Sequence, residues 1–362
     1  RSWFHEVLAH FNDIVMNVAN SARLQEECEV LVLRIVRVAQ VKDIDFGEYK
    51  SCMLASLRSL LPQDWSATHE VAWCWLWDNV ERLLDQHLTD APKWGRALSG
   101  FLGSLNEDSR FELRKDVYVR FFEEAPAGAM FFKQSNTYLH YIADRILDMT
   151  VELYNDPAKM VDSISALGLR HVGYGIPPEL MGPFVSAFCD CTARSATDEL
   201  VPASMRWSVG LIAKILARTI IEGSTIVMKA INLNSPSKVL EALSSAPRAE
   251  RSKWVLLVKV GTQDISPLSW AIESGSFQAT KAMLEDLLTI RADRDQYYYG
   301  AEALFKRHPD IIQRLCSEAP MVLWTLFDGL VWRSRMIEDG QRRVNYYLKY
   351  LVVTPDGSPA QA

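Results

Sequence analysis

The sequence predicts an all-α fold, because apolar residues recur at helical spacing through most of the chain. Residues 136–153 give the clearest pattern, with one apolar stripe formed by Leu139, Ile142, Ala143, Ile146 and Leu147. The tryptophans at 73, 75 and 77 alternate in a way that resembles a strand. The longer apolar pattern of residues 68–87 favours a helix there as well.

The size and composition of the chain are typical of a soluble protein with more than one domain. Its 362 residues predict two or three domains. Hydrophobic residues make up 49% and charged residues 23%, as in globular proteins. The formal net charge of −6 gives no reason to expect nucleic acid or an anionic membrane as a partner.

The cysteines and the apolar segments indicate in which cell compartment the protein resides. The six cysteines have no framework spacing, which indicates reduced thiols and a cytoplasmic setting. No signal peptide is visible, and the chain begins inside a helical pattern, so we expect a piece of a longer protein. Residues 205–221 are the most apolar stretch, but Lys214 and Arg218 interrupt it, so no membrane span is predicted.

The first 88 residues contain four segments with a helical apolar period: 6–18, 26–38, 46–61 and 68–87. Ser66 or Thr68, followed by Glu70, is a suitable start for the fourth helix. In a helix, Trp75 and Trp77 lie on different faces, so we expect residues 68–87 to contact a protein partner.

Residues 164–180 contain the principal candidate site. Ile164, Leu167 and His171 share one helical face, and Gly173 and Gly175 are expected to end that helix. Pro177, Pro178 and Glu179 are typical of the start of the next helix. An imidazole on such an apolar face can hold a metal or a flat cofactor. The alternative is a hydrogen-bonded histidine of the core.

These residues resemble the proximal side of the haem pocket in globins. That family has a leucine four residues before the proximal histidine, here Leu167, and an aliphatic residue five after it, here Ile176. Upstream, residues 117–133 resemble the globin segment that ends in the phenylalanine stacked on haem, here Phe132. Residues 205–221 resemble the last long globin helix, and the resemblance covers residues 92–222.

The resemblance implies one haem b with His171 as the ligand of its iron. It implies that Phe132 packs on the porphyrin and that Leu167 and Ile176 line the proximal side. Tyr118 falls where bacterial and flavo-type globins carry a distal tyrosine, which can donate a hydrogen bond to bound dioxygen or another small gaseous ligand. The alternative for Tyr118 is a half-buried tyrosine of the core.

Residues 136–153 then correspond to the distal helix, and the residue that faces the iron is left open. His140 falls on the charged side with Asp144, Arg145 and Asp148, which argues against it. Tyr138 and Leu139 are better placed, with Ile142 on the same apolar side. A shift of one residue in the alignment between this helix and His171 decides between Tyr138 and Leu139, and we favour Tyr138 weakly.

The resemblance also extends to both ends of the chain. Residues 31–36 parallel 167–172, so we interpret residues 1–88 as the C-terminal half of a degenerate globin. Ile35 stands at its ligand position, so this half is expected to bind no haem. The alternative is an unrelated helical extension. The complete globin would then span 89–222.

The C-terminal part is predicted to consist of a helical linker, 223–262, and degenerate repeats, 263–353. Ser235-Pro-Ser indicates a cap or linker. Residues 264–275 resemble the start of an ankyrin repeat, with a second helix at 277–288, and 300–317 look like another copy. One or two repeats cannot bury their own faces, so we expect them either to cap another part of the protein or to continue beyond this sequence. Residues 354–362 are expected to be a disordered tail.

The sequence does not predict an enzyme, since no catalytic triad, phosphate-binding loop or carboxylate pair is recognisable and no reductase domain is present. Two functions remain. One is a haem module for gas binding or sensing. The other is a structural subunit that binds a protein through residues 68–87 or the ankyrin-like region.

Overall fold

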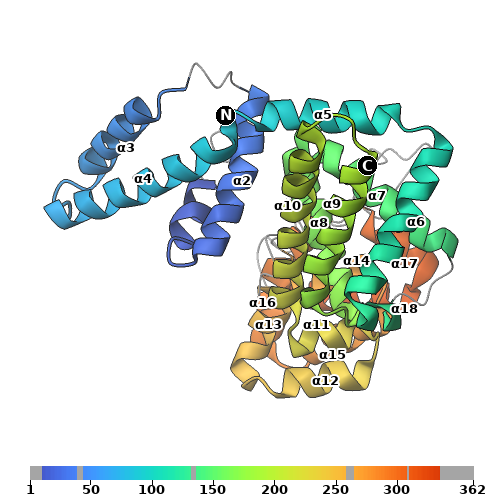
Figure 1. Ribbon diagram of the computed structural model, residues 1–362. Helices are drawn as coiled ribbons and strands as arrows, with labels where there is room; N and C mark the ends of the chain where they lie inside the picture. Colours follow the sequence, from blue (N-terminus) through green and yellow to red (C-terminus); the bar gives the residue numbers. More distant parts are fainter. Residues whose placement is uncertain (1–9, 39–43, 132–135, 258–264, 308–309, 335–362) are drawn as a thin grey trace, which may run out of the picture. The chain divides into compact units, whose positions relative to one another are not determined.

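The computed structural model describes residues 10–38, 44–131, 136–257, 265–307 and 310–334. Within these ranges the regular structure is entirely helical, which confirms the all-α prediction (Figure 1). The chain divides into two compact units. Unit 1 comprises Arg1–Ile164 and Pro177–Ala217, and unit 2 comprises Ser165–Ile176 and Arg218–Ala362.

Unit 1 begins with a helical stretch at residues 10–16 and three helices, α2 (Ser21–Val38), α3 (Phe46–Leu60) and α4 (Ala67–Leu88). The helices predicted at 26–38, 46–61 and 68–87 are therefore confirmed. The predicted start of α4 is also confirmed, because the Ser66 side chain accepts a hydrogen bond from the His69 amide.

A small apolar core joins α2 to α4. Val32 and Val80 are fully buried in it, and Ile35 packs against it. Trp77 is buried in the same core, whereas Trp75 is 56% exposed. The two tryptophans thus lie on different faces of α4, as expected from their spacing.

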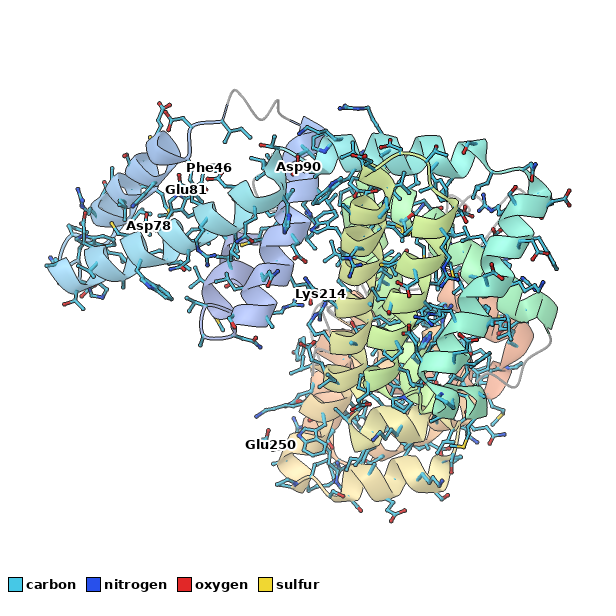
Figure 2. All side chains as sticks on the ribbon, viewed as in Figure 1. Phe46, Asp78, Glu81, Asp90, Lys214 and Glu250 are labelled. Atoms are coloured by element: carbon cyan, nitrogen blue, oxygen red, sulfur yellow. The ribbon has the colours of Figure 1, made fainter. Side chains whose placement is uncertain are left out.

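Polar and aromatic contacts attach α3 to α4. The Lys50 ammonium lies 2.5 Å from the Asp78 carboxylate, and the Tyr49 ring stacks on the Trp77 ring at 4.8 Å between centroids. The Trp77 indole also donates to the Phe46 carbonyl at 3.4 Å. Figure 2 labels Phe46 and Asp78 on the two helices. Since the Asp78 side chain is 60% exposed, its ion pair with Lys50 stabilises the two helices only modestly.

The rest of unit 1, among its described residues, consists of further α-helices and two short 3₁₀ helices. They are α5 (Ala91–Ser104), α6 (Glu107–Glu124), η2 (Pro126–Met130), α7 (Asn136–Asn155), the first part of α8 (Pro157–Tyr174), η3 (Pro178–Leu180), α9 (Met181–Ser195) and most of α10 (Leu200–Gly223). α6 lies along α9, and α7 packs against α5 and α6. The apolar stripe predicted for α7 faces the core, with Leu139, Ala143 and Leu147 buried.

The end of α8 differs from the sequence prediction. Both Gly173 and Gly175 were expected to break the helix, but α8 continues through Gly173 to Tyr174. Glycine inside a helix costs only about 1 kcal/mol, which the surrounding helix tolerates. Gly175 does end it, with φ of +66°, a conformation that glycine adopts without strain. The next helix begins with η3 at Pro178 rather than directly as α9.

Unit 2 contains eight further helices among its described residues. They are α11 (Ile226–Asn232), α12 (Pro236–Ser244), α13 (Arg251–Leu256), α14 (Pro267–Glu273), α15 (Phe277–Leu287), α16 (Arg291–Arg307), α17 (Ile311–Glu318) and α18 (Pro320–Ser334). A single apolar core runs through them and includes Trp270, Tyr297 and Phe305. The stretch 223–262, expected as a linker, contributes α11–α13 to this core.

The helices of unit 2 form a structural repeat. Ser266 caps α14 as Thr225 caps α11, 41 residues earlier in the chain. The same interval separates Asn234 (φ +47°) from Gly275 (φ +73°), the residues that turn the chain into α12 and α15. In space, α11 packs on α14, α12 on α15, and α13 on α16. α15 then packs on α18, so successive layers stack as in a helical solenoid.

Hydrogen bonds connect each layer to the next. The Asn234 side-chain oxygen accepts from the amides of Gln278 (3.0 Å) and Ala279 (3.1 Å) at the start of α15. In the following layer, Arg314 of α17 donates to the carbonyls of Ile272 (3.1 Å) and Glu273 (3.2 Å) at the end of α14. Asn234 therefore satisfies amides at the start of α15, and Arg314 satisfies carbonyls at the end of α14, which a helix end would otherwise leave unpaired.

The Asn234 contacts lead to a stability prediction. Asn234→Gly should cost about 1 kcal/mol, because it removes the cap of α15 but keeps the left-handed conformation accessible. Asn234→Ala should cost about 2–3 kcal/mol, since it also forces alanine into that conformation. Chemical denaturation followed by circular dichroism would measure both, and faster amide exchange at Gln278 and Ala279 should accompany each change. Equal losses in the two variants would contradict the role of φ.

Candidate functional site

His171 lies near the C-terminal end of α8, and its ring orientation is fixed by a hydrogen bond. Its Nδ1 is 2.8 Å from the carbonyl oxygen of Leu167, one turn earlier in the same helix. A carbonyl oxygen can only accept, so Nδ1 carries the proton and Nε2 carries the lone pair. Histidines that ligate metals are commonly held in this way, with the remaining ring N–H donated to a carbonyl or carboxylate.

The surroundings of His171 favour the neutral imidazole. Burial lowers the pKa of His171, and the Leu167 carbonyl opposes that shift only in part. The charged form is disfavoured because a partly buried ring loses hydration that the surroundings do not replace. A neutral ring with a free Nε2 lone pair is the form that coordinates iron or zinc.

The predicted proximal residues lie together in the segment Ser165–Ile176 of unit 2. Leu167 is partly buried, and Ile176 is 8% exposed. The Ile176 amide donates to the His171 carbonyl at 3.4 Å, which ties the turn after α8 to the histidine. Leu169, two residues before His171, is fully buried in the core of unit 2.

A hydrogen-bonded connection that the sequence did not predict holds this segment in place. The Asn232 amide donates to the Leu169 carbonyl at 3.2 Å. The Asn232 oxygen in turn accepts from the Trp270 indole at 2.9 Å. An asparagine at the end of a short helix gives no sequence signal for partners 63 and 38 residues away.

The predicted distal residues of α6 and α7 lie in unit 1. Tyr118 is 6% exposed, and its ring lies 6.0 Å from that of Phe122 and 6.1 Å from that of Phe184. Burial raises the pKa of the Tyr118 hydroxyl, and the nearby Tyr138 phenol raises it further. The structure thus brings Tyr118 and Tyr138 near each other, with Tyr118 in an aromatic cluster.

The alternatives on α7 differ in exposure. Tyr138 is 48% exposed, Leu139 is 8% exposed, and Ile142 is partly buried. The His140 ring stacks on the Phe111 ring of α6, with centroids 4.7 Å apart. Phe132, the residue expected on the porphyrin face, lies outside the described residues.

α10 is the one described helix that is long and apolar enough to cross a membrane, judged by length and composition alone. Core helices of soluble proteins meet the same criterion. In α10, 44% of the most apolar window is buried, and the Lys214 ammonium pairs with the Glu29 carboxylate at 2.8 Å. An ion pair within the helix is a feature of packing against protein, and a single helix of this kind is weak evidence for a membrane span.

No known family model matches the chain, and no curated protein or solved structure is significantly similar to it.

Proposed function

We propose that the chain is a haem-binding module in which His171 is the axial ligand of a haem b. The hydrogen bond from Nδ1 to the Leu167 carbonyl is the observation that supports this proposal most strongly. It leaves Nε2 as the coordinating atom and sets the plane of the ring. The lowered pKa of His171 supports it too, since an imidazolium cannot coordinate iron.

The other residues have defined roles in this proposal. Leu167 and Ile176 form an apolar wall that keeps water from the proximal side. Ferrous haem supplies reversible binding of dioxygen or another small gaseous ligand when such a pocket surrounds it. By the same resemblance to globins, Tyr118 would donate a hydrogen bond from its hydroxyl to the bound ligand, and its raised pKa keeps the hydroxyl protonated at neutral pH.

The remaining contacts of the haem follow from the resemblance to globins. Phe132 packs on the porphyrin, and Tyr138, Leu139 and Ile142 line the distal side. Residues 89–222 form the complete globin, and residues 1–88 form a degenerate half without haem. Residues 263–353 contain the ankyrin-like repeats, in which the gas signal is relayed or a partner is bound. All six cysteines are free thiols, which fits the cytoplasm.

Haem reconstitution tests the proposal directly. Purified chain mixed with haemin should retain about one haem per chain after desalting, measured by the pyridine haemochrome. His171→Ala should lose the Soret band, because the variant lacks the imidazole that ligates the iron. Added imidazole should restore part of the band by occupying the vacated position.

His140→Ala is the matched control, since His140 is also a partly buried histidine but is stacked on Phe111. It should retain haem in the normal stoichiometry. Circular dichroism should show equal helicity for both variants. A wild-type chain that takes up no haem, or a His171→Ala chain that keeps it, would overturn the proposal.

A second candidate function is that of a structural interaction subunit. The stacked layers of unit 2 favour it, because solenoids of this kind present extended binding surfaces. Trp324 and Met321 on α18 are 73% and 62% exposed. In unit 1, Trp75 of α4 is a further exposed aromatic residue. Large exposed apolar side chains that gather in a patch mark partner sites. A folded chain that binds no haem would favour this function over the first.

A further inference from the structure

A histidine lies against two tryptophans where three helices of unit 1 meet. The His87 ring, in the last turn of α4, lies 5.6 Å from the Trp94 ring of α5 and 5.7 Å from the Trp207 ring of α10, measured between centroids. The two tryptophan rings are 5.3 Å apart, so the three rings contact one another. Tyr154 of α7 adds a fourth ring, 5.9 Å from that of Trp207. This aromatic cluster therefore joins the end of α4 to α5 and α10.

Two nitrogen atoms of the aromatic cluster are buried without a hydrogen bond. Among the described residues, neither Nδ1 of His87 nor Nε1 of Trp207 has a partner. In the neutral imidazole Nδ1 can be the acceptor nitrogen, and an unpaired acceptor is less costly to bury than a charge. Protonation would make Nδ1 a charged N–H donor without an acceptor. The packed arrangement thus suits the neutral ring only.

The charged groups around His87 do not offset this cost. Glu29 of α2 and Asp90, which follows α4, favour the charged ring. Lys214 of α10 opposes it, and its ammonium is paired with Glu29 at 2.8 Å, so their effects on His87 largely cancel. Figure 2 labels Asp90 and Lys214. On the α7 side, burial raises the pKa of Tyr154, which therefore stays neutral. Burial is the largest influence on His87 and lowers its pKa from the ordinary 6.5.

We propose that His87 is a pH-dependent switch, which holds the end of α4 against Trp94 and Trp207 when neutral and releases it when protonated. In the released state the imidazolium turns towards water, which accepts hydrogen bonds from both of its N–H groups. The junction of α4 with α5 and α10 then loosens. Because α4 shares a core with α2, the loosening reaches the first helices of unit 1.

Linkage gives the direction of the pH effect. In an opened or unfolded chain His87 binds its proton with an ordinary pKa of 6.5, whereas the packed ring binds it only at lower pH. The opened state therefore holds more protons in this window. The stability of the junction is complete above the ordinary pKa and falls as the pH drops towards the pKa of the packed ring. At still lower pH both states are protonated, and the loss is constant.

Hydrogen exchange of the full chain, measured by mass spectrometry at about pH 7.5 and about pH 5.5, tests the proposal. The rates are corrected for the pH dependence of exchange in unstructured peptides. We expect the amides of residues 84–98 to exchange several-fold faster at the lower pH. The amides of α15, in the core of unit 2, serve as the internal reference.

Two variants remove the titrating group. His87→Phe keeps an aromatic ring in the cluster but cannot take up a proton, so residues 84–98 should exchange equally at both pH values. His87→Gln is a second side chain that does not titrate, and it should abolish the response even if phenylalanine packs differently. His69→Gln is the matched control, because His69 is an exposed histidine on the same helix, 2.8 Å from the Ser66 hydroxyl. This control should keep the wild-type response.

Equal exchange of residues 84–98 at the two pH values in the wild type would overturn the proposal. An acid response that persists in both His87 variants would overturn it too, because another group would then be responsible. The measurements need no haem, and a His171→Ala chain should respond as the wild type does. Failure here therefore leaves the haem proposal intact, and the reverse also holds.

Discussion

Replacing Trp270 with alanine is expected to destabilise unit 2 by about 4–6 kcal/mol. Trp270 is 1% exposed in the apolar core, and truncating a buried tryptophan costs roughly 3–5 kcal/mol through lost burial and the cavity left behind. The change also removes the indole donor of the partly buried Asn232 side chain, and loss of such a hydrogen bond adds about 1 kcal/mol. Because total stabilities are commonly about 5–15 kcal/mol, unit 2 would be close to unfolding.

Urea denaturation followed by far-ultraviolet circular dichroism measures this loss without relying on tryptophan fluorescence. Trp270→Phe is the control, since it keeps an aromatic ring in the core but lacks the N–H. It should lose about 1–2 kcal/mol, from the lost hydrogen bond to Asn232 and from the smaller ring. If alanine were tolerated as well as phenylalanine, the residue would not be the packing centre that its burial indicates.

The second large effect is expected at the ion pair between Lys214 and Glu29. The Glu29 side chain is 3% exposed, and both its oxygens lie 2.8–2.9 Å from the Lys214 ammonium. Lys214→Met leaves a buried carboxylate whose remaining hydrogen-bond partner among the described residues is the Gln25 amide. Breaking a buried pair costs about 3–5 kcal/mol, and since Lys214 is 46% exposed we expect about 2–3 kcal/mol.

A double-mutant cycle separates the pair from its surroundings. Lys214→Met combined with Glu29→Met should recover most of the loss, because two packed apolar side chains can replace a buried pair. Thermal or urea unfolding of the four proteins gives the coupling energy, which should exceed about 1 kcal/mol. Strictly additive losses would show that the two residues act independently.

Local signals made several elements of the fold predictable from the sequence. The Ser66 cap and the apolar stripe of α7 depend on residues within a few turns of each other, so composition and spacing reveal them. The same holds for the shared face of Leu167 and His171. Gly173 misled the prediction, because the packing of a helix can outweigh the weak propensity of one glycine.

Features that depend on distant partners could not be predicted. Residues 223–262 were expected to be helical, but their packing as the first layer of unit 2 was not predicted, because Asn234 gives little sequence sign that it adopts a left-handed conformation. The link from Trp270 through Asn232 to Leu169 joins residues far apart in the chain. The choice between Tyr138 and Leu139 depended on the rotation of α7, which one residue of slack reverses. Their exposures, 48% and 8%, show how much that rotation changes.

Hydrogen bonds link the layers of unit 2 one after another, and the last of them reaches α8 close to His171. Arg314 holds the end of α14, Trp270 of α14 holds Asn232, and Asn232 holds the Leu169 carbonyl in the last turns of α8. In a stack where each layer touches only its neighbours, bending is transmitted from one layer to the next. A movement of α17 would therefore be passed through these hydrogen bonds to the Leu169 carbonyl of α8, two residues before His171.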